Sequence, residues 1–148
     1  MIEAHHNFIA ALACAALALP LSVTAAEDKA TKMSTKDRVV IQVSDADPQK
    51  WNLALNNAKN VQTDLGADKT EIEIVAYGPG IGMLKADAIV ANRVEDAVAA
   101  GVKVVACEST MKAQKITRDD MQKNVSYVAA GVVQLMRRQQ QGYAYIRP

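Results

Sequence analysis

Apolar and polar positions form alternating blocks along residues 38–148, and these blocks predict strands and helices in turn. Arg38 to Ser44 (RVVIQVS) is a continuous run rich in β-branched residues, which is typical of a central strand covered on both faces. Further strands are predicted over 71–77, 102–107, 126–129 and 143–146. Because strand-like and helix-like segments alternate, the pattern indicates parallel βα units. The expected fold class is α/β, with a mainly parallel sheet of about five strands.

The segments between the strands carry helical spacing. Asp47 is placed as an N-cap and Pro48 as the first helical residue, and Gly66 is placed to end the same helix. The predicted buried face of this helix consists of Trp51, Leu55, Ala58 and Leu65. Other helices are predicted over 86–100, from Thr117 onward, and over 131–141, with Ile116 and Met121 spaced for a hydrophobic staple around Thr117.

Three loops follow predicted strands at their carboxyl ends. They are Ser44–Asp47, Tyr77–Gly82 and Cys107–Met111. In a parallel sheet such loops gather at one edge, where ligands usually bind. The fold pattern therefore predicts that these three loops lie close together.

Composition narrows the range of partners. The chain has 17 Lys and Arg against 16 Asp and Glu, a formal net charge of +1. This balance creates no field strong enough to recruit nucleic acid or an anionic membrane surface. Aromatic residues make up 4% of the chain, too few for base-stacking platforms. We expect no nucleic-acid partner and, once the N-terminal segment is removed, no membrane.

The first 26 residues have the build of a secretory signal peptide. Phe8 to Val23 is an apolar run without charge, broken by Pro20 and followed by the small residues Ala25 and Ala26. The alternative is an uncleaved membrane anchor, for which the run is short against a span of about 20 residues. We expect residues 1–26 to be a signal peptide, 27–37 a flexible leader and 38–148 one domain located in the periplasm.

Signal removal limits the chemistry of the mature chain. It removes His5, His6 and Cys14, so no histidine remains and Cys107 is the single cysteine. Hydrolase arrangements with a histidine base are thereby absent, as is a zinc site of the usual His/Cys type. The loop 78–82 (GPGIG) matches neither a Walker A motif nor a dinucleotide fingerprint. We expect no metal and no cofactor.

Cys107 is the distinctive reactive group, and three interpretations of it stay open. A lone cysteine at the end of a strand is often a buried apolar thiol without a chemical role. In an exported protein, however, an unpaired thiol is a liability unless it is sheltered or used. A third interpretation is a redox sensor, in which Cys107 forms mixed or intermolecular disulfides.

The residues around Cys107 supply the candidate ligand-binding groups. Backbone N–H groups in glycine-rich and strand-end loops, together with nearby ammonium groups, stabilise a thiolate or a bound anion. The candidates are Gly78, Gly80, Gly82, Ser109, Thr110 and Lys112, with Lys115 as a second ammonium. The two lysines fit an ordinary solvated surface equally well.

Four segments of the sequence resemble the DsrE/DsrF-like family, in particular its exported single-domain members. The segments are VVIQVS, EIEIVAYGPGIGML, GVKVVACESTMKAQKI and AAGVVQLMRRQQQGYAYIRP, which together span about residues 38–148. The resemblance implies a three-layer α/β/α fold of flavodoxin-like architecture, commonly assembled as trimers or hexamers. Its best-understood members carry sulfur as a persulfide on a cysteine after a central strand, and Cys107 has a similar position.

Two functions are therefore carried forward. In the first, the protein is a periplasmic sulfur carrier or sulfurtransferase-like protein that takes sulfane sulfur from a small sulfur-containing anion or a partner protein and holds it on Cys107. In the second, it is a non-catalytic oligomeric module for ligand binding or assembly, and Cys107 is structural. The aromatic tail 143–146 (YAYI) favours a homo-oligomer in either case, because an exposed edge strand is a liability for a monomer.

Overall fold

The computed structural model describes residues 36–148. The predicted signal peptide (1–26) and all but the last two residues of the predicted leader (27–37) lie outside the described residues. Among the described residues, no helix is both long and apolar enough to cross a membrane.

The strands form one sheet in which every neighbouring pair is parallel. Their bounds are β1 Asp37–Val43, β2 Thr70–Ala76, β3 Lys103–Cys107, β4 Ser126–Val128 and β5 Ala144–Ile146. The order across the sheet is β4-β3-β2-β1-β5. The expected α/β fold with five strands is confirmed, and each predicted strand is present with its ends shifted by one residue at most.

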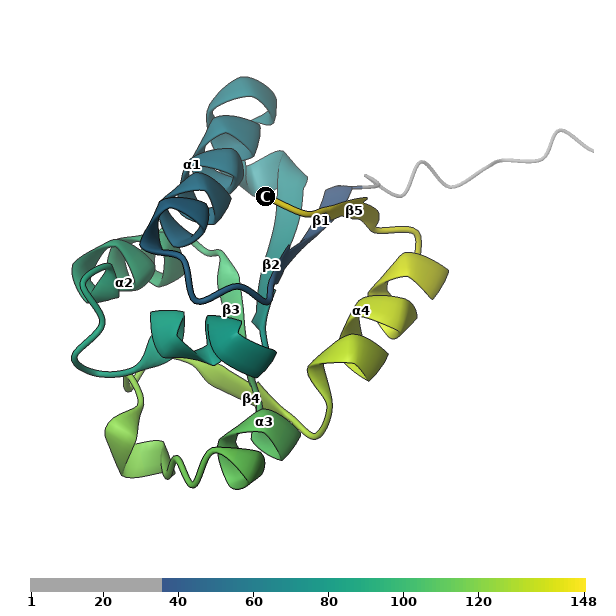
Figure 1. Cartoon of the computed structure of the whole chain (residues 1–148). Coiled ribbons are helices and arrows are strands. Elements are labelled where there is room, and N and C mark those ends of the chain that lie inside the picture. The colour runs from purple at the N-terminus through teal and green to yellow at the C-terminus, as the bar shows by residue number, and fades with distance from the viewer. Residues whose placement is uncertain (1–35) are drawn as a thin grey trace, which may run out of the picture. The chain divides into compact units, whose positions relative to one another are not determined.

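The helices form two layers, one on each side of the sheet (Figure 1). The α-helices are α1 Pro48–Leu65, α2 Ala91–Ala99, α3 Glu108–Ala113 and α4 Gly131–Gln140, and the 3₁₀ segments are η1 Ala67–Lys69, η2 Gly78–Leu84 and η3 Arg118–Asp120. Helices α1, α2 and α3 contribute to the larger of two buried clusters, and α4 to the smaller one. Among the helices of residues 36–148, α4 is therefore the one that covers the second face, which completes the three layers.

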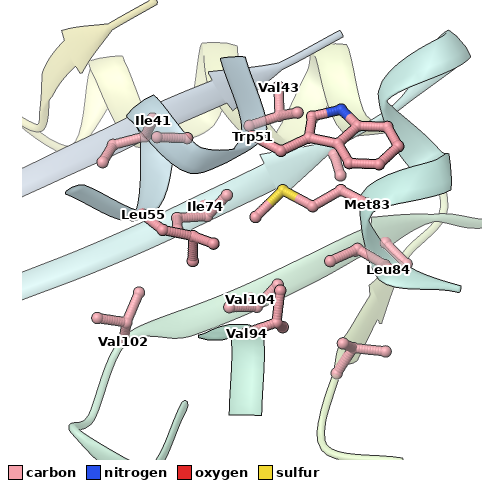
Figure 2. Packing of buried hydrophobic residues seen from close by; sticks show 14 of the residues in the cluster. Ile41, Val43, Trp51, Leu55, Ile74, Met83, Leu84, Val94, Val102 and Val104 are labelled. Carbon is pink, nitrogen blue, oxygen red and sulfur yellow. The ribbon is translucent and has the colours of Figure 1, made fainter. Parts of the chain in front are cut away.

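The larger cluster fills the space between the sheet and α1 and α2 (Figure 2). The side chains of Ile41, Ile74 and Val104 come from the three central strands, and all are 1% exposed or less. Trp51 and Leu55 of α1 belong to the same cluster and pack on this face of the sheet. Burial of this apolar surface is the main stabilising term of the domain.

The smaller cluster lies on the opposite face, as the alternation of side chains along a strand requires. Val40, Val75 and Val105 contact Leu135 of α4 and Tyr143. Cys107 follows Val105 by two residues, so its side chain also points to the α4 side of the sheet.

Both predicted ends of α1 are confirmed, but one residue of its predicted buried face is exposed. The Asp47 carboxylate accepts from the Gln49 N–H at 2.8 Å, and Gly66 ends the helix with a φ of 93°. Leu65, predicted to be buried, is 45% exposed. Burial fades along the helix, from Ala58 through the partly buried Val61, because the last turn extends past the cluster.

The predicted helix over 86–100 begins five residues later, at Ala91. Lys85 pairs with Met121 as an isolated antiparallel bridge, and the Ala86 N–H donates to the Asp120 carbonyl at 2.9 Å. The bridge and this bond tie the start of the segment to the chain around Asp120, and residues 86–90 form turns rather than helix, so tertiary pairing overrides the helical pattern.

The segment after Cys107 was predicted as a loop and is helix α3. It follows β3 without a spacer, since Cys107 itself is the N-cap. The helix predicted from Thr117 is only the single turn η3, although Thr117 and Asp120 form a reciprocal capping box. Ile116 and Met121 both pack into the larger cluster, so the residues of the proposed staple are buried or partly buried.

Candidate functional site

Cys107 lies where the chain changes direction across the sheet. Strands β3 and β4 are neighbours, and Cys107 is paired in register with Val128. Helix α3 leaves β3 toward the face that carries α1, whereas α4 leaves β4 toward the opposite face. Cys107 therefore lies at the carboxyl edge of the sheet, which is where ligands usually bind in such folds.

The sulfur of Cys107 is held by the start of α4. The N–H of Gly131 donates to Cys107 Sγ at 3.2 Å. A Cβ at position 131 would lie 2.9 Å from Tyr77 Cβ and 3.3 Å from Cys107 Cβ. Only glycine therefore lets α4 approach the strand end this closely without a shift. Cys107 is 4% exposed and forms no disulfide.

The pKa of the Cys107 thiol lies below its usual value. Burial by itself raises this pKa, because a thiolate loses hydration. Hydrogen bonds outweigh the effect of burial: they come from the Thr110 hydroxyl and from the N–H groups of Gly131, Thr110 and Ser109. The site therefore stabilises the thiolate, the nucleophilic form of cysteine, relative to an ordinary cysteine.

Thr110 connects Cys107 to the glycine-rich segment after β2. Its hydroxyl accepts from the Gly78 N–H at 2.9 Å, and Gln114 Nε2 donates to the Gly78 carbonyl at 3.2 Å. Gly78 has a φ of 53°, a left-handed conformation that favours glycine. Gly78 and Thr110 are thus brought to the site together, and the hydroxyl proton of Thr110 is left for the sulfur.

Ser109 ties α3 to the segment that precedes α4. Its hydroxyl donates to the Ala129 carbonyl at 2.6 Å, and its N–H donates to the same oxygen at 3.0 Å. The Ser109 side chain is therefore engaged within the chain, and it ties the start of α3 to the segment between β4 and α4.

Gly80 and Gly82 belong to η2, and both face β1 and α1 rather than Cys107. The Gly80 N–H donates to the Tyr77 carbonyl at 3.1 Å, and Gly80 packs directly on the backbone of Val43. Gly82 faces the indole ring of Trp51. Both glycines serve close packing of this segment on β1 and α1, and the segment reaches the sulfur through Gly78 and Thr110.

Lys112 is exposed on α3, and no hydrogen bond or ion pair joins it to Cys107 in the part of the chain that the structure describes. Lys115 follows the helix with a φ of 55°. The pKa of the thiol is lowered by hydrogen-bond donors, with no contribution from either lysine.

Gly131 contacts Cys107 Sγ but was not among the site residues predicted from the sequence. The sequence marked it only as a glycine that opens a predicted helix directly after a short predicted strand.

Residues 36–148 contain no group of three or more His, Cys, Asp or Glu side chains that could hold a metal ion. The groove of about 410 Å³ between α1 and α2 is lined by none of the predicted site residues.

These features define a class: an α/β protein with a parallel sheet whose lone described cysteine lies at the carboxyl edge among converging donors. The model of the DsrE/DsrF-like family matches residues 37–148. The chain therefore belongs to the DsrE/DsrF-like family, and this membership suggests a role related to sulfur relay.

Solved structures with the same fold include the following two. A protein of unknown function, MTH1491 from Methanobacterium thermoautotrophicum, is 35% identical, with a TM-score of 0.71 over 75% of this chain and 98% of that one. A conserved protein of unknown function, BT1422 from Bacteroides thetaiotaomicron, is 14% identical, with a TM-score of 0.63 over 78% and 98% of the two chains, and shows the fold alone. No curated protein matches the sequence.

Proposed function

We propose that the protein is an exported, periplasmic sulfur carrier in which Cys107 accepts sulfane sulfur and holds it as a persulfide. The observation that carries the proposal is the set of donors around Cys107 Sγ, led by the Thr110 hydroxyl and the Gly131 N–H at 3.2 Å. Donors that stabilise a thiolate also suit the terminal sulfur of a persulfide, which carries the same negative charge.

The transfer step balances with a small anionic donor such as thiosulfate. The thiolate attacks the outer, sulfane sulfur, a new S–S bond forms at Cys107, and the S–S bond of thiosulfate breaks to release sulfite. The sulfane sulfur moves with no external oxidant or reductant. An acceptor thiolate then attacks the terminal sulfur and regenerates the Cys107 thiolate.

Incubation with thiosulfate or polysulfide should add one sulfur atom to the protein, and the added sulfur should be released by cyanide as thiocyanate. The Cys107→Ser variant should show no such gain, since a hydroxyl does not form a persulfide. Intact mass and cyanolysis measure both results. A wild-type protein that gains no sulfur, or a gain that persists in Cys107→Ser, would contradict the proposal.

The burial of Cys107 favours a second candidate, a non-catalytic ligand-binding or assembly module with a structural thiol. Cys107 is 4% exposed as a residue, which limits access to small reagents. This candidate expects that native Cys107 resists small alkylating reagents and that Cys107→Ala folds and assembles normally. Prompt alkylation of native Cys107 at neutral pH, located by peptide mass mapping, would exclude it in favour of the sulfur carrier.

We also propose that the protein is a homo-oligomer, a trimer or hexamer. Strand β5 forms an edge of the sheet, and Tyr145 is 41% exposed there. Tyr143 is buried within its own subunit, where it packs on Val40 and Val75, so its burial needs no partner. Light scattering at micromolar concentration should give a mass of three or six subunits, and a monomeric mass would contradict this assembly.

A further inference from the structure

A charged side chain lies beneath α4, on the face of the sheet that carries Cys107. Glu73 of β2 is 1% exposed. Its oxygens accept from Gln134 Nε2 at 2.5 Å and from Arg138 Nε at 3.0 Å and Nη2 at 2.5 Å, and Lys103 of β3 adds an ion pair at 3.4 Å. A carboxylate this deeply buried needs such partners, because it has lost its hydration.

The two α4 residues that bind Glu73, Gln134 and Arg138, lie on the same side of the helix as Gly131, whose N–H donates to Cys107 Sγ. Gly131, Gln134 and Arg138 are separated by three and four residues, so they lie on one face of the helix. The bonds to Glu73 therefore act on the same surface of α4 that presents Gly131 to Cys107.

A second contact fixes the other end of α4. The Tyr143 hydroxyl donates to Glu71 and accepts from Arg138 Nη1 at 3.2 Å. The guanidinium of Arg138 also lies 4.8 Å from the centre of the Tyr143 ring. Arg138 is thus held on two sides, by β2 and by the residue that leads into β5.

We propose that Glu73, acting through Gln134 and Arg138, is a positioning residue for the Cys107 site, an inference that rests on the proposed role of Cys107. Apolar packing of Leu135 holds α4 against the sheet but leaves small slides and rotations open. Hydrogen bonds to a carboxylate are directional and charge-assisted, so α4 cannot slide or turn without losing them. They set the distance between the Gly131 N–H and the sulfur.

The test is the pH profile of alkylation at Cys107, measured with iodoacetamide on the purified protein and located by peptide mass mapping. In Glu73→Gln, loss of the carboxylate releases α4, and the Gly131 bond to the thiolate weakens. The alkylation rate at neutral pH should fall about tenfold, the effect of losing one hydrogen bond to a charged group. The midpoint of the profile should move up correspondingly.

Gln134→Met is the second variant, because it keeps the Glu73–Arg138 ion pair and removes only the bond nearest to Gly131. It should move the midpoint in the same direction by less. Tyr145→Phe is the matched control, since it removes a hydrogen bond to Gln42 between β5 and β1 without touching α4. Its profile should match the wild type.

A folded Glu73→Gln or Gln134→Met protein with the wild-type profile would overturn the inference, since a merely stabilising contact would leave the titration of the native thiol unchanged. The outcome is separable from that of sulfur loading. If the wild-type protein gains no sulfur while the variants still shift the profile, the proposed function fails and the positioning role stands.

Discussion

Gly80→Ala should destabilise the domain more than any other single methyl group added at a glycine of the described chain. A Cβ at position 80 would lie 2.3 Å from the Val43 carbonyl oxygen and 2.6 Å from its carbon. Those atoms belong to the backbone at the end of β1, so they cannot rotate away as a side chain can. We expect a loss of about 3 kcal/mol, at the upper end for overpacking, and an unfolding midpoint lower by about 10 °C.

Gly82→Ala is the matched control in the same turn. Its Cβ would meet the edge of the Trp51 ring at 3.3 Å, a contact that a small tilt of the ring relieves. Thermal unfolding followed by circular dichroism should separate the two variants clearly. If Gly80→Ala were as stable as Gly82→Ala, the close packing of η2 on β1 would not contribute as described.

The sheet could be predicted from the sequence because each strand carries its own signal. The β-branched run of β1 and the apolar run of β3 are buried from both sides, so their composition alone marks them. Helix α3 could not be predicted in the same way. It has six residues and a single buried one, Met111, which is too little for a helical period to be visible.

The site was only partly predictable, for a related reason. Cys107 is the last residue of β3 and Thr110 lies three residues later, so the topology of a parallel sheet places them at the ligand edge. Gly131 and Glu73 act through contacts 24 and 61 residues away in the chain, with Cys107 and Gln134 respectively. No local pattern encodes such an approach. In the sequence Glu73 is one of two glutamates in a strand, where alternation alone would place it on a solvated face.

Gly131→Ala should raise the pKa of Cys107 more than a substitution of Lys112 or Lys115 would. Gly131 does not have a positive φ, so alanine fits the backbone conformation, and alanine is the better helix former. The obstacle is steric: the new Cβ would lie 2.9 Å from Tyr77 Cβ, which is fixed to its backbone. The start of α4 must move away, and the 3.2 Å bond from the N–H to Cys107 Sγ lengthens or breaks.

The expected sign of the change follows from the charge on sulfur. Loss of a donor to the thiolate raises the pKa of Cys107 toward its ordinary value, so less thiolate is present at neutral pH. Alkylation and sulfur loading at neutral pH should each fall about tenfold. At a pH above the Cys107 pKa of both proteins, the thiol is ionised in the wild type and in the variant, and their alkylation rates should converge.

Val132→Ala is the control for Gly131→Ala. Val132 is the next residue in the first turn of α4 and is 62% exposed, so its truncation leaves the approach to Cys107 intact. A Gly131→Ala protein with the pH profile of Val132→Ala would show that the α4 N–H does not stabilise the thiolate. If instead both Gly131→Ala and Glu73→Gln raise the midpoint, and the double variant raises it no further, the two residues act on one bond. Such non-additivity would show that the placement of α4 is what lowers the pKa of Cys107 through this bond.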